Sequence, residues 1–127
     1  MIDEIKSYYQ KRGLKEPTAL EALMWLISEV GELVDACCQT PDAISGVGLQ
    51  LDIYLSVLID QCRVIERTVA EQSGWVRNNQ PKGTYDLPGE VGDVLMMLSV
   101  FAEKAGLPEP EVCLREKMER KLRDVQR

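Results

Sequence analysis

The segment at residues 88–105, PGEVGDVLMMLSVFAEKA, constrains the fold more than any other part of the chain. After its opening turn only Ser99, Glu103 and Lys104 interrupt the apolar residues. On a helix with about 100° per residue, apolar side chains therefore extend almost all the way round. Such a helix is surrounded by other elements in a folded protein. The segment predicts a central helix that the rest of the chain must cover.

The rest of the chain also predicts helices, because its apolar residues recur with the helical period. We expect helices at about 2–12, 17–39, 47–72 and 110 to the end. Glycine, proline and asparagine mark the stretches QTPDAISGVG and SGWVRNNQPKGTYDLPG as loops. No strand-like alternation competes with this pattern. A length of 127 residues suits one hydrophobic core. We therefore predict a single all-α domain over residues 1–127, a compact bundle of four or five helices.

The apolar stripes predict which side of each helix faces the core. On the helix at 17–39 the stripe comprises Leu20, Leu23, Met24, Ile27, Gly31, Val34 and Cys38. On the last helix Val112, Met118, Leu122 and Val125 are expected to point inward. Leu26 and Leu33 lie off the main stripe, so the helices carry more apolar surface than one small bundle encloses. We therefore expect a homo-oligomer built on a dimer.

Composition excludes several classes of function. A net charge of −6 argues against a general binder of nucleic acids or membrane surfaces, and no apolar run is long enough to span a bilayer. The first residues, MIDEIKSYYQ, carry acids where a signal peptide carries basic residues. The four cysteines form no C-x-x-C spacing and are expected to be reduced thiols in a cytoplasmic protein. Since histidine is absent, catalytic triads, His-bearing zinc sites and Glu-x-x-His di-iron sites are excluded.

A four-residue phrase occurs twice, as EVGE at 29–32 and as EVGD at 90–93. Each copy places two carboxylates three residues apart, on one side of a helix. Taken alone, Glu29 and Glu32 are typical of a solvated outer face. Glu90 and Asp93 suit a helix N-terminus, where an acid contributes about 0.3–1 kcal/mol. However, their helix is expected to be surrounded, and buried carboxylates need cations or metal ions.

The two pairs of acids form one site if their helices pack side by side at about 8–10 Å. Four carboxylates without histidine or thiolate favour Mg²⁺ or Mn²⁺. The alternative is four solvated acids with no metal. Gly31 points about 130° away from the acids on a helical wheel, so we expect it to admit another helix from behind.

Two stretches, LISEVGELVDA and PGEVGDVLMMLSVFAEKAGLPEPEVCLREKMERKLR, together resemble the MazG-type all-α nucleoside triphosphate pyrophosphatases. That family is marked by E-x-x-E on one helix and by E-x-x-D on a later one. The second motif continues into D-V-L, an apolar helix and a basic last helix. The resemblance covers about residues 17–40 and 88–124. Residues 41–88 add a helix and a loop that the shortest members of the family lack.

The resemblance implies a Mg²⁺-dependent enzyme that hydrolyses a nucleoside or deoxynucleoside triphosphate, standard or modified, to monophosphate and pyrophosphate. It implies four metal ligands: Glu29, Glu32, Glu90 and Asp93. Mn²⁺ is the second candidate ion. Either Glu29 or Glu32 is expected to take the proton of the attacking water. The family also implies a homodimer or a dimer of dimers.

The last helix is expected to contribute cations to the substrate site. The resemblance places Lys117 and Arg123 near phosphate, and Lys121 stands where the family has asparagine. The simpler interpretation is that these cations only form i,i+4 pairs on an exposed helix. Trp25 lies one turn before Glu29 on the same side, so its ring could stack on a nucleobase. Packing in a core or a subunit contact is the alternative for Trp25.

A different class of function is a non-catalytic helical module that dimerises as an adaptor and keeps a degenerate acidic site. Two departures from the family pattern favour it. Ser28 stands where an additional acid is often found, and Lys121 replaces the asparagine of the last helix. The presence of all four motif acids favours the enzyme.

Overall fold

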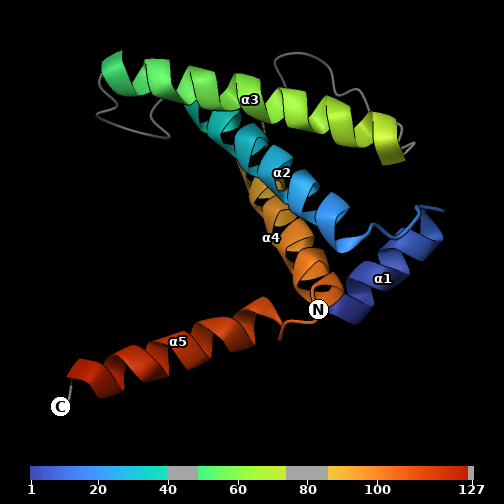
Figure 1. Ribbon diagram of the computed structural model, residues 1–127, viewed down its shortest axis with the longest axis vertical. Coiled ribbons are helices and arrows are strands. Elements are labelled where there is room, and N and C mark those ends of the chain that lie inside the picture. The colour runs from blue at the N-terminus through green and yellow to red at the C-terminus, as the bar shows by residue number, and fades with distance from the viewer. Residues whose placement is uncertain (40–48, 74–85, 126–127) are drawn as a thin grey trace.

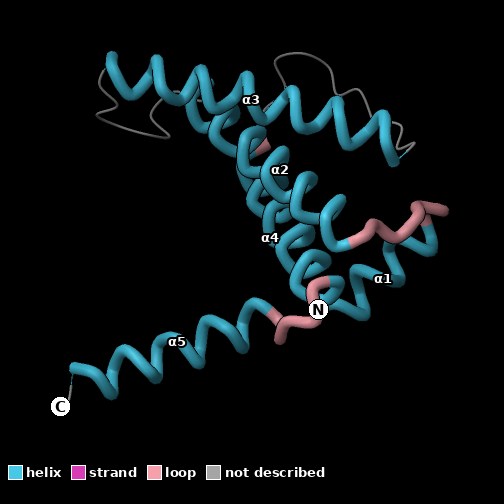
Figure 2. The backbone as a smooth tube through the Cα atoms, in the orientation of Figure 1, coloured by secondary structure: helices cyan, strands magenta, loops and turns pink. Residues whose placement is uncertain are grey.

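The computed structural model describes residues 1–39, 49–73 and 86–125. These residues form five α-helices: α1 Ile2–Lys11, α2 Ala19–Gln39, α3 Leu49–Ser73, α4 Leu87–Lys104 and α5 Pro110–Val125 (Figure 1). The described part of the chain contains no strand, and short turns join α1 to α2 and α4 to α5 (Figure 2). The predicted all-α fold is confirmed. The loops expected at 40–48 and 74–85 lie outside the described residues.

Glycine and proline set the observed helix ends, as the sequence predicts. Gly13 follows α1 with φ +64° and Gly106 follows α4 with φ +71°. This left-handed conformation carries little strain only for glycine. Pro88 lies in the first turn of α4, where its missing N–H has no partner to lose.

Helix α2 occupies the centre of the described chain, because it packs against both α3 and α4, while α1 and α5 lie against α4 (Figure 1). The buried core draws on four helices; its members are Ile5, Tyr9, Ala22, Trp25, Val69, Met97 and Val100. The prediction that the helix at 88–105 is surrounded is wrong for a single chain. Val91 and Leu95 of α4 remain 55% and 40% exposed, because α2 and α1 cover only part of its circumference.

The predicted core stripe of α2 is also wrong in part. Leu20 is 67% exposed and Ile27 37% exposed, whereas Trp25 and Ala36 on the other side are buried. The reason is that α3 and α4 contact α2 along two neighbouring sides, and most of the stripe lies outside both. Gly31 behaves as predicted: a Cβ there would lie 2.8 Å from the Sγ atom of Cys62 on α3. The glycine therefore permits the close approach of α2 and α3.

Helix α5 leaves the other four helices at the C-terminal end of α4 and runs away from α2 and α3 (Figure 1). None of its described residues is buried. The expectation that Met118, Leu122 and Val125 point into the core is therefore wrong, since they are 49%, 62% and 83% exposed. Among the described helices, α5 packs only against α4.

Among the described residues, ion pairs join separate parts of the chain at the surface. Arg63 of α3 lies 3.0 Å from Asp35 of α2, and Lys104 lies 2.7 Å from Glu16. Lys6 of α1 pairs with Glu103 of α4. All three are partly exposed, so solvent screens them and each contributes little to stability. Within the described residues, no helix has the length and apolar character needed to cross a membrane.

Candidate metal centre

The four acids of the repeated motif come together between α2 and α4. One carboxylate oxygen from each of Glu29, Glu32, Glu90 and Asp93 lies within 4.8 Å of the others, and all four residues are half-buried. Two come from the middle of α2 and two from the first turns of α4. The convergence expected from two facing helices is therefore present. We call these four residues the acidic cluster.

The acidic cluster lies on the buried side of α2. Glu29 follows Trp25 by one turn, and Ala36 follows Glu32 by one turn, so the acids share a helix side with two buried residues. On α4, Met97 follows Asp93 by one turn and is also buried. The interpretation of Glu29 and Glu32 as a solvated outer face is therefore not supported.

An apolar floor lies below the acidic cluster. Trp25 and Met97 belong to the core together with Tyr9 of α1. The hydroxyl of Tyr9 donates a hydrogen bond to the Sδ atom of Met97 at 3.4 Å. Burial in this region raises the pKa of Tyr9 to about 12, with a smaller contribution from the charges of Tyr8 and Glu29. The acids therefore lie against a surface of low polarity rather than in open solvent.

Burial and mutual repulsion shift the titration of the acidic cluster. Burial is the largest cause that raises the pKa of Glu29 to about 9, followed by the charge of Glu32 and a hydrogen bond with it. Burial and the charges of Glu32 and Asp93 raise the pKa of Glu90 to about 7. The pKa of Asp93 is raised for the same kinds of reason. Among the described residues, the charged groups that raise these three pKa values are other carboxylates, whose repulsion a bound cation would relieve.

Two carboxylate oxygens of the acidic cluster have no hydrogen-bond partner among the described residues. They are Oε2 of Glu29 and Oε2 of Glu90, and both are buried. A buried polar atom without a partner destabilises a protein by about 1–3 kcal/mol. A hard divalent cation would satisfy both atoms. Mg²⁺ binds oxygen at about 2.0–2.1 Å, so oxygens that share one ion lie roughly 3–4 Å apart. The donor set therefore fits Mg²⁺ or Mn²⁺, and oxygens within 4.8 Å of one another lie close to this spacing.

The structure does not bring the other predicted site residues to the acidic cluster. Trp25 is only 8% exposed and packs in the core, so its ring faces are not open to a nucleobase. Lys117, Lys121 and Arg123 are exposed on α5. That helix begins beyond the Lys104 end of α4, whereas Glu90 and Asp93 lie near the opposite end (Figure 1).

Sequence reasoning missed Asp86, which immediately precedes α4. Its charge contributes to the raised pKa values of Glu90 and Asp93. A Cβ added at Gly89 would collide with the Asp86 carboxylate, so this side chain folds back over the first turn of α4. The signal was the stretch DLPGEVGD, which has an acid four residues before Glu90. Tyr9 carried no such signal, because it reaches the floor of the acidic cluster from a separate helix.

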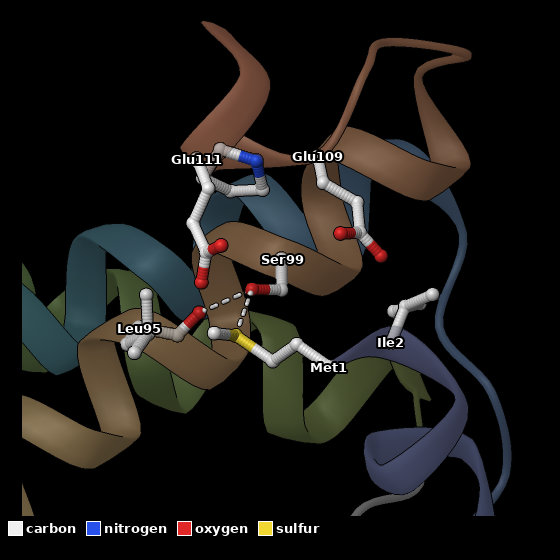
Figure 3. Close-up of a pocket in the computed structure, with 7 residues that line it drawn as sticks. Met1, Ile2, Leu95, Ser99, Glu109 and Glu111 are labelled. Carbon is white, nitrogen blue, oxygen red and sulfur yellow. Dashed lines mark hydrogen bonds between the residues drawn. The ribbon is translucent and has the colours of Figure 1, made fainter. Parts of the chain in front are cut away.

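A small pocket lies where α1, α4 and the start of α5 meet (Figure 3). Ser99 donates a hydrogen bond to the carbonyl oxygen of Leu95 at 2.9 Å and lies 3.5 Å from the Sδ atom of Met1. None of the residues that line this pocket belongs to the acidic cluster. The acidic cluster is therefore the stronger candidate for a functional site.

Fold and site together define an all-α chain with four carboxylates gathered between two helices. No protein-family model, curated protein or solved structure matches the chain.

Proposed function

We propose that this protein is a Mg²⁺-dependent nucleoside triphosphate pyrophosphohydrolase of the MazG-like kind, acting in the cytoplasm. Its substrate is a nucleoside or deoxynucleoside triphosphate, standard or modified, and its products are the monophosphate and pyrophosphate. The observation that supports this best is the gathering of both acidic motifs into one cluster, with carboxylate oxygens within 4.8 Å of one another. The order of the two acidic motifs and the residues in them resemble the MazG family, and this resemblance is the basis for the proposed reaction.

The acidic cluster would hold the divalent ion through Glu29, Glu32, Glu90 and Asp93, with Mn²⁺ as an alternative to Mg²⁺. When bound, the ion supplies positive charge for a triphosphate that the acids alone would repel, and it lowers the pKa of a bound water. The ion would satisfy Oε2 of Glu29 and Oε2 of Glu90, the two buried oxygens of the cluster that have no hydrogen-bond partner among the described residues.

Glu29 and Glu32 are the candidates for the general base. They share a hydrogen bond, so one carboxylate can hold a proton while the other stays ionised. The base takes a proton from water as the water oxygen attacks the α phosphorus. The bond from that phosphorus to the bridging oxygen then breaks, and pyrophosphate leaves with the electron pair. The low polarity of the floor strengthens each of these electrostatic interactions.

The acidic cluster alone does not recognise the pyrophosphate leaving group or the nucleobase. Residues other than those that lie at the cluster within one chain must do so. Lys117, Lys121 and Arg123 have the charge that pyrophosphate requires, but they lie on α5. Trp25 is better described as part of the floor than as a stacking surface, because it is buried.

A second candidate is the non-catalytic helical adaptor that dimerises and keeps a degenerate acidic site. The raised pKa values of Glu29 and Glu90 favour it, since protonated carboxyl groups can pack together without a metal ion. The two candidates differ in their response to Mg²⁺. A ligand at 100 times its Kd stabilises a folded protein by about 2.7 kcal/mol, whereas an adaptor without a metal site gains nothing.

Product analysis of a single turnover tests the proposed reaction. A panel of standard and modified nucleoside triphosphates is incubated with the protein and Mg²⁺, and monophosphate, diphosphate, pyrophosphate and phosphate are separated. We expect monophosphate and pyrophosphate without a diphosphate intermediate. Free phosphate with accumulating diphosphate would mean that attack falls on the γ phosphorus, and the proposed reaction would be wrong. No turnover of any member would favour the adaptor.

A further inference from the structure

Asp86 is a carboxylate at the start of α4 whose side chain does not cap the helix. It directly precedes the first turn of α4, where an aspartate side chain ordinarily accepts a hydrogen bond from a backbone N–H of that turn. Within the described chain its carboxylate makes no such capping hydrogen bond. The backbone carbonyl of Asp86 instead accepts a hydrogen bond from the N–H of Glu90 at 2.9 Å. Capping therefore does not explain where this exposed carboxylate lies.

Gly89 makes room for the carboxylate of Asp86. A Cβ added at Gly89 would lie 2.9 Å from the Cγ atom of Asp86 and would collide with its Oδ2 atom. A glycine in a helix costs about 1 kcal/mol relative to alanine. An alanine at position 89 would displace the Asp86 side chain, which is short and can rotate away. The glycine is thus what permits the observed position of the carboxylate.

Asp86 lies on the side of α4 that carries the acidic cluster. At about 100° per residue, it stands about 40° from Glu90 and about 20° from Asp93 around the helix. Its charge contributes to the raised pKa values of both residues, as expected of a close neighbour. However, Asp86 is not one of the four acids whose oxygens lie within 4.8 Å of one another. It therefore lies just outside the cluster, one turn before Glu90.

A carboxylate in this position suits the water shell of a bound ion rather than direct coordination. Mg²⁺ dehydrates reluctantly and usually keeps several of its waters in protein sites. Those waters donate hydrogen bonds, and an exposed carboxylate beside the protein ligands can accept one. Groups that contact a metal site in this indirect way typically change metal affinity by about 10–100-fold.

We propose that Asp86 is a positioning residue of the metal centre, which accepts a hydrogen bond from a water on the ion held by the acidic cluster, and that Gly89 provides the space for its carboxylate. Both residues lie outside the two repeated phrases. The inference rests on the proposed function in one respect, namely that the acidic cluster binds a divalent ion. It does not depend on hydrolysis of a nucleotide.

Calorimetric titration of the metal-free protein with Mg²⁺ tests the role of Asp86 without nucleotide. Asp86→Asn removes the charge but keeps a side chain that is as good an N-cap as aspartate. We expect it to weaken Mg²⁺ binding by about 10-fold or more. Gly89→Ala keeps the charge but displaces the carboxylate, and should weaken binding by a similar factor. Gly92→Ala is the matched control, because a Cβ there meets nothing within 4 Å, and it should bind Mg²⁺ as the natural chain does.

The double variant Asp86→Asn/Gly89→Ala tests whether the two changes act through the same carboxylate. If they do, the double variant should bind Mg²⁺ about as weakly as Asp86→Asn alone. Independent effects would instead multiply. Circular dichroism of each metal-free variant checks that the helix content is that of the natural chain.

Three results would overturn the proposal: unchanged Mg²⁺ affinity in Asp86→Asn, natural affinity in Gly89→Ala, or losses that multiply in the double variant. Natural affinity in Gly89→Ala would mean that the charge of Asp86 matters but its position does not. A natural chain that fails to bind millimolar Mg²⁺ would also overturn it. Failure of the proposed function is seen separately, because a chain that binds Mg²⁺ with the help of Asp86 but releases no pyrophosphate keeps this inference and loses the proposed reaction.

Discussion

The two copies of the repeated phrase, EVGE in α2 and EVGD in α4, use their acids alike and their glycines differently. All four acids converge on one place. Gly31, however, lies against Cys62 of α3, whereas Gly92 faces open space. The comparison teaches that two local sequences can be similar for one shared reason, the acidic cluster, and still pack differently. Gly31 serves a contact within the chain, whereas no described residue packs against Gly92.

The largest expected effect concerns the acidic cluster, to which both copies of the repeated phrase contribute. Asp93→Asn should lower nucleoside triphosphate hydrolysis by about 100-fold or more, since even partners behind metal ligands contribute 10–100-fold. Metal-free stability should hold or rise, because one of several repelling carboxylates is removed. Steady-state kinetics and urea unfolding measure the two effects. Glu103→Gln, a carboxylate at the other end of α4, serves as the control and should retain activity. Full turnover by Asp93→Asn would refute the role of the acidic cluster.

The next effect concerns Gly31, which packs against α3, unlike Gly92 in the other copy of the phrase. Gly31→Ala should lower the free energy of unfolding by about 1–3 kcal/mol, because its Cβ would overlap Cys62 and force α2 and α3 apart. Urea unfolding followed by circular dichroism measures this change. If stability is unchanged, the close approach of α2 and α3 at this position is wrong.

A pH dependence is expected from the shared acidic cluster. In the folded protein the pKa of Glu29 is raised to about 9 and that of Glu90 to about 7. An unfolded glutamate titrates near pH 4.3, about its ordinary pKa. The folded state therefore binds more protons over this interval, and the free energy of unfolding falls as pH rises.

The contribution is fully present below about pH 4 and is lost as pH rises through about 7 and then 9. Thermal unfolding in a chelator between pH 5 and pH 9 measures it. Glu29→Gln/Glu90→Gln should give a flatter profile than the natural chain. A stability that rises across this range in the natural chain would contradict the raised pKa values.

The smallest expected effect concerns Gly92. Gly92→Ala should raise the free energy of unfolding by about 0.5–1 kcal/mol, because alanine favours a helix and the space is open. Urea unfolding followed by circular dichroism measures this gain. A loss of stability in Gly92→Ala would contradict the open space at this position.

The helices themselves could be predicted from the sequence, because glycine and proline mark the ends of α1 and α4 as the pattern indicates. The exposed side of α2 could not. The helical period of apolar residues identifies a stripe, such as the one that contains Leu20 and Ile27. It does not identify which sides of α2 the neighbouring helices will cover. Small residues such as Ala36 gave no sign that the side with Glu29 would be closed by α4.

The same limit applies to α5 and to the site. The stripe with Met118 and Leu122 predicts a covered helix side, but both residues are exposed in the described chain, because a helical period does not say whether a neighbouring element lies against it. The convergence of the four acids followed from their placement on two helices that face each other. Asp86 was missed because it lies outside the repeated phrase, and its charge acts on Glu90 and Asp93 only once α4 has formed.

The central claim is that the acidic cluster binds a divalent cation, and Mg²⁺-dependent thermal unfolding tests it most directly. The natural chain and Asp93→Asn are unfolded at one pH near neutrality, with a chelator or with increasing Mg²⁺. We expect Mg²⁺ to stabilise the natural chain progressively, by about 2.7 kcal/mol at 100 times its Kd, and to leave Asp93→Asn almost unchanged. Equal stabilisation of both proteins, or none in the natural chain at millimolar Mg²⁺, would contradict the claim.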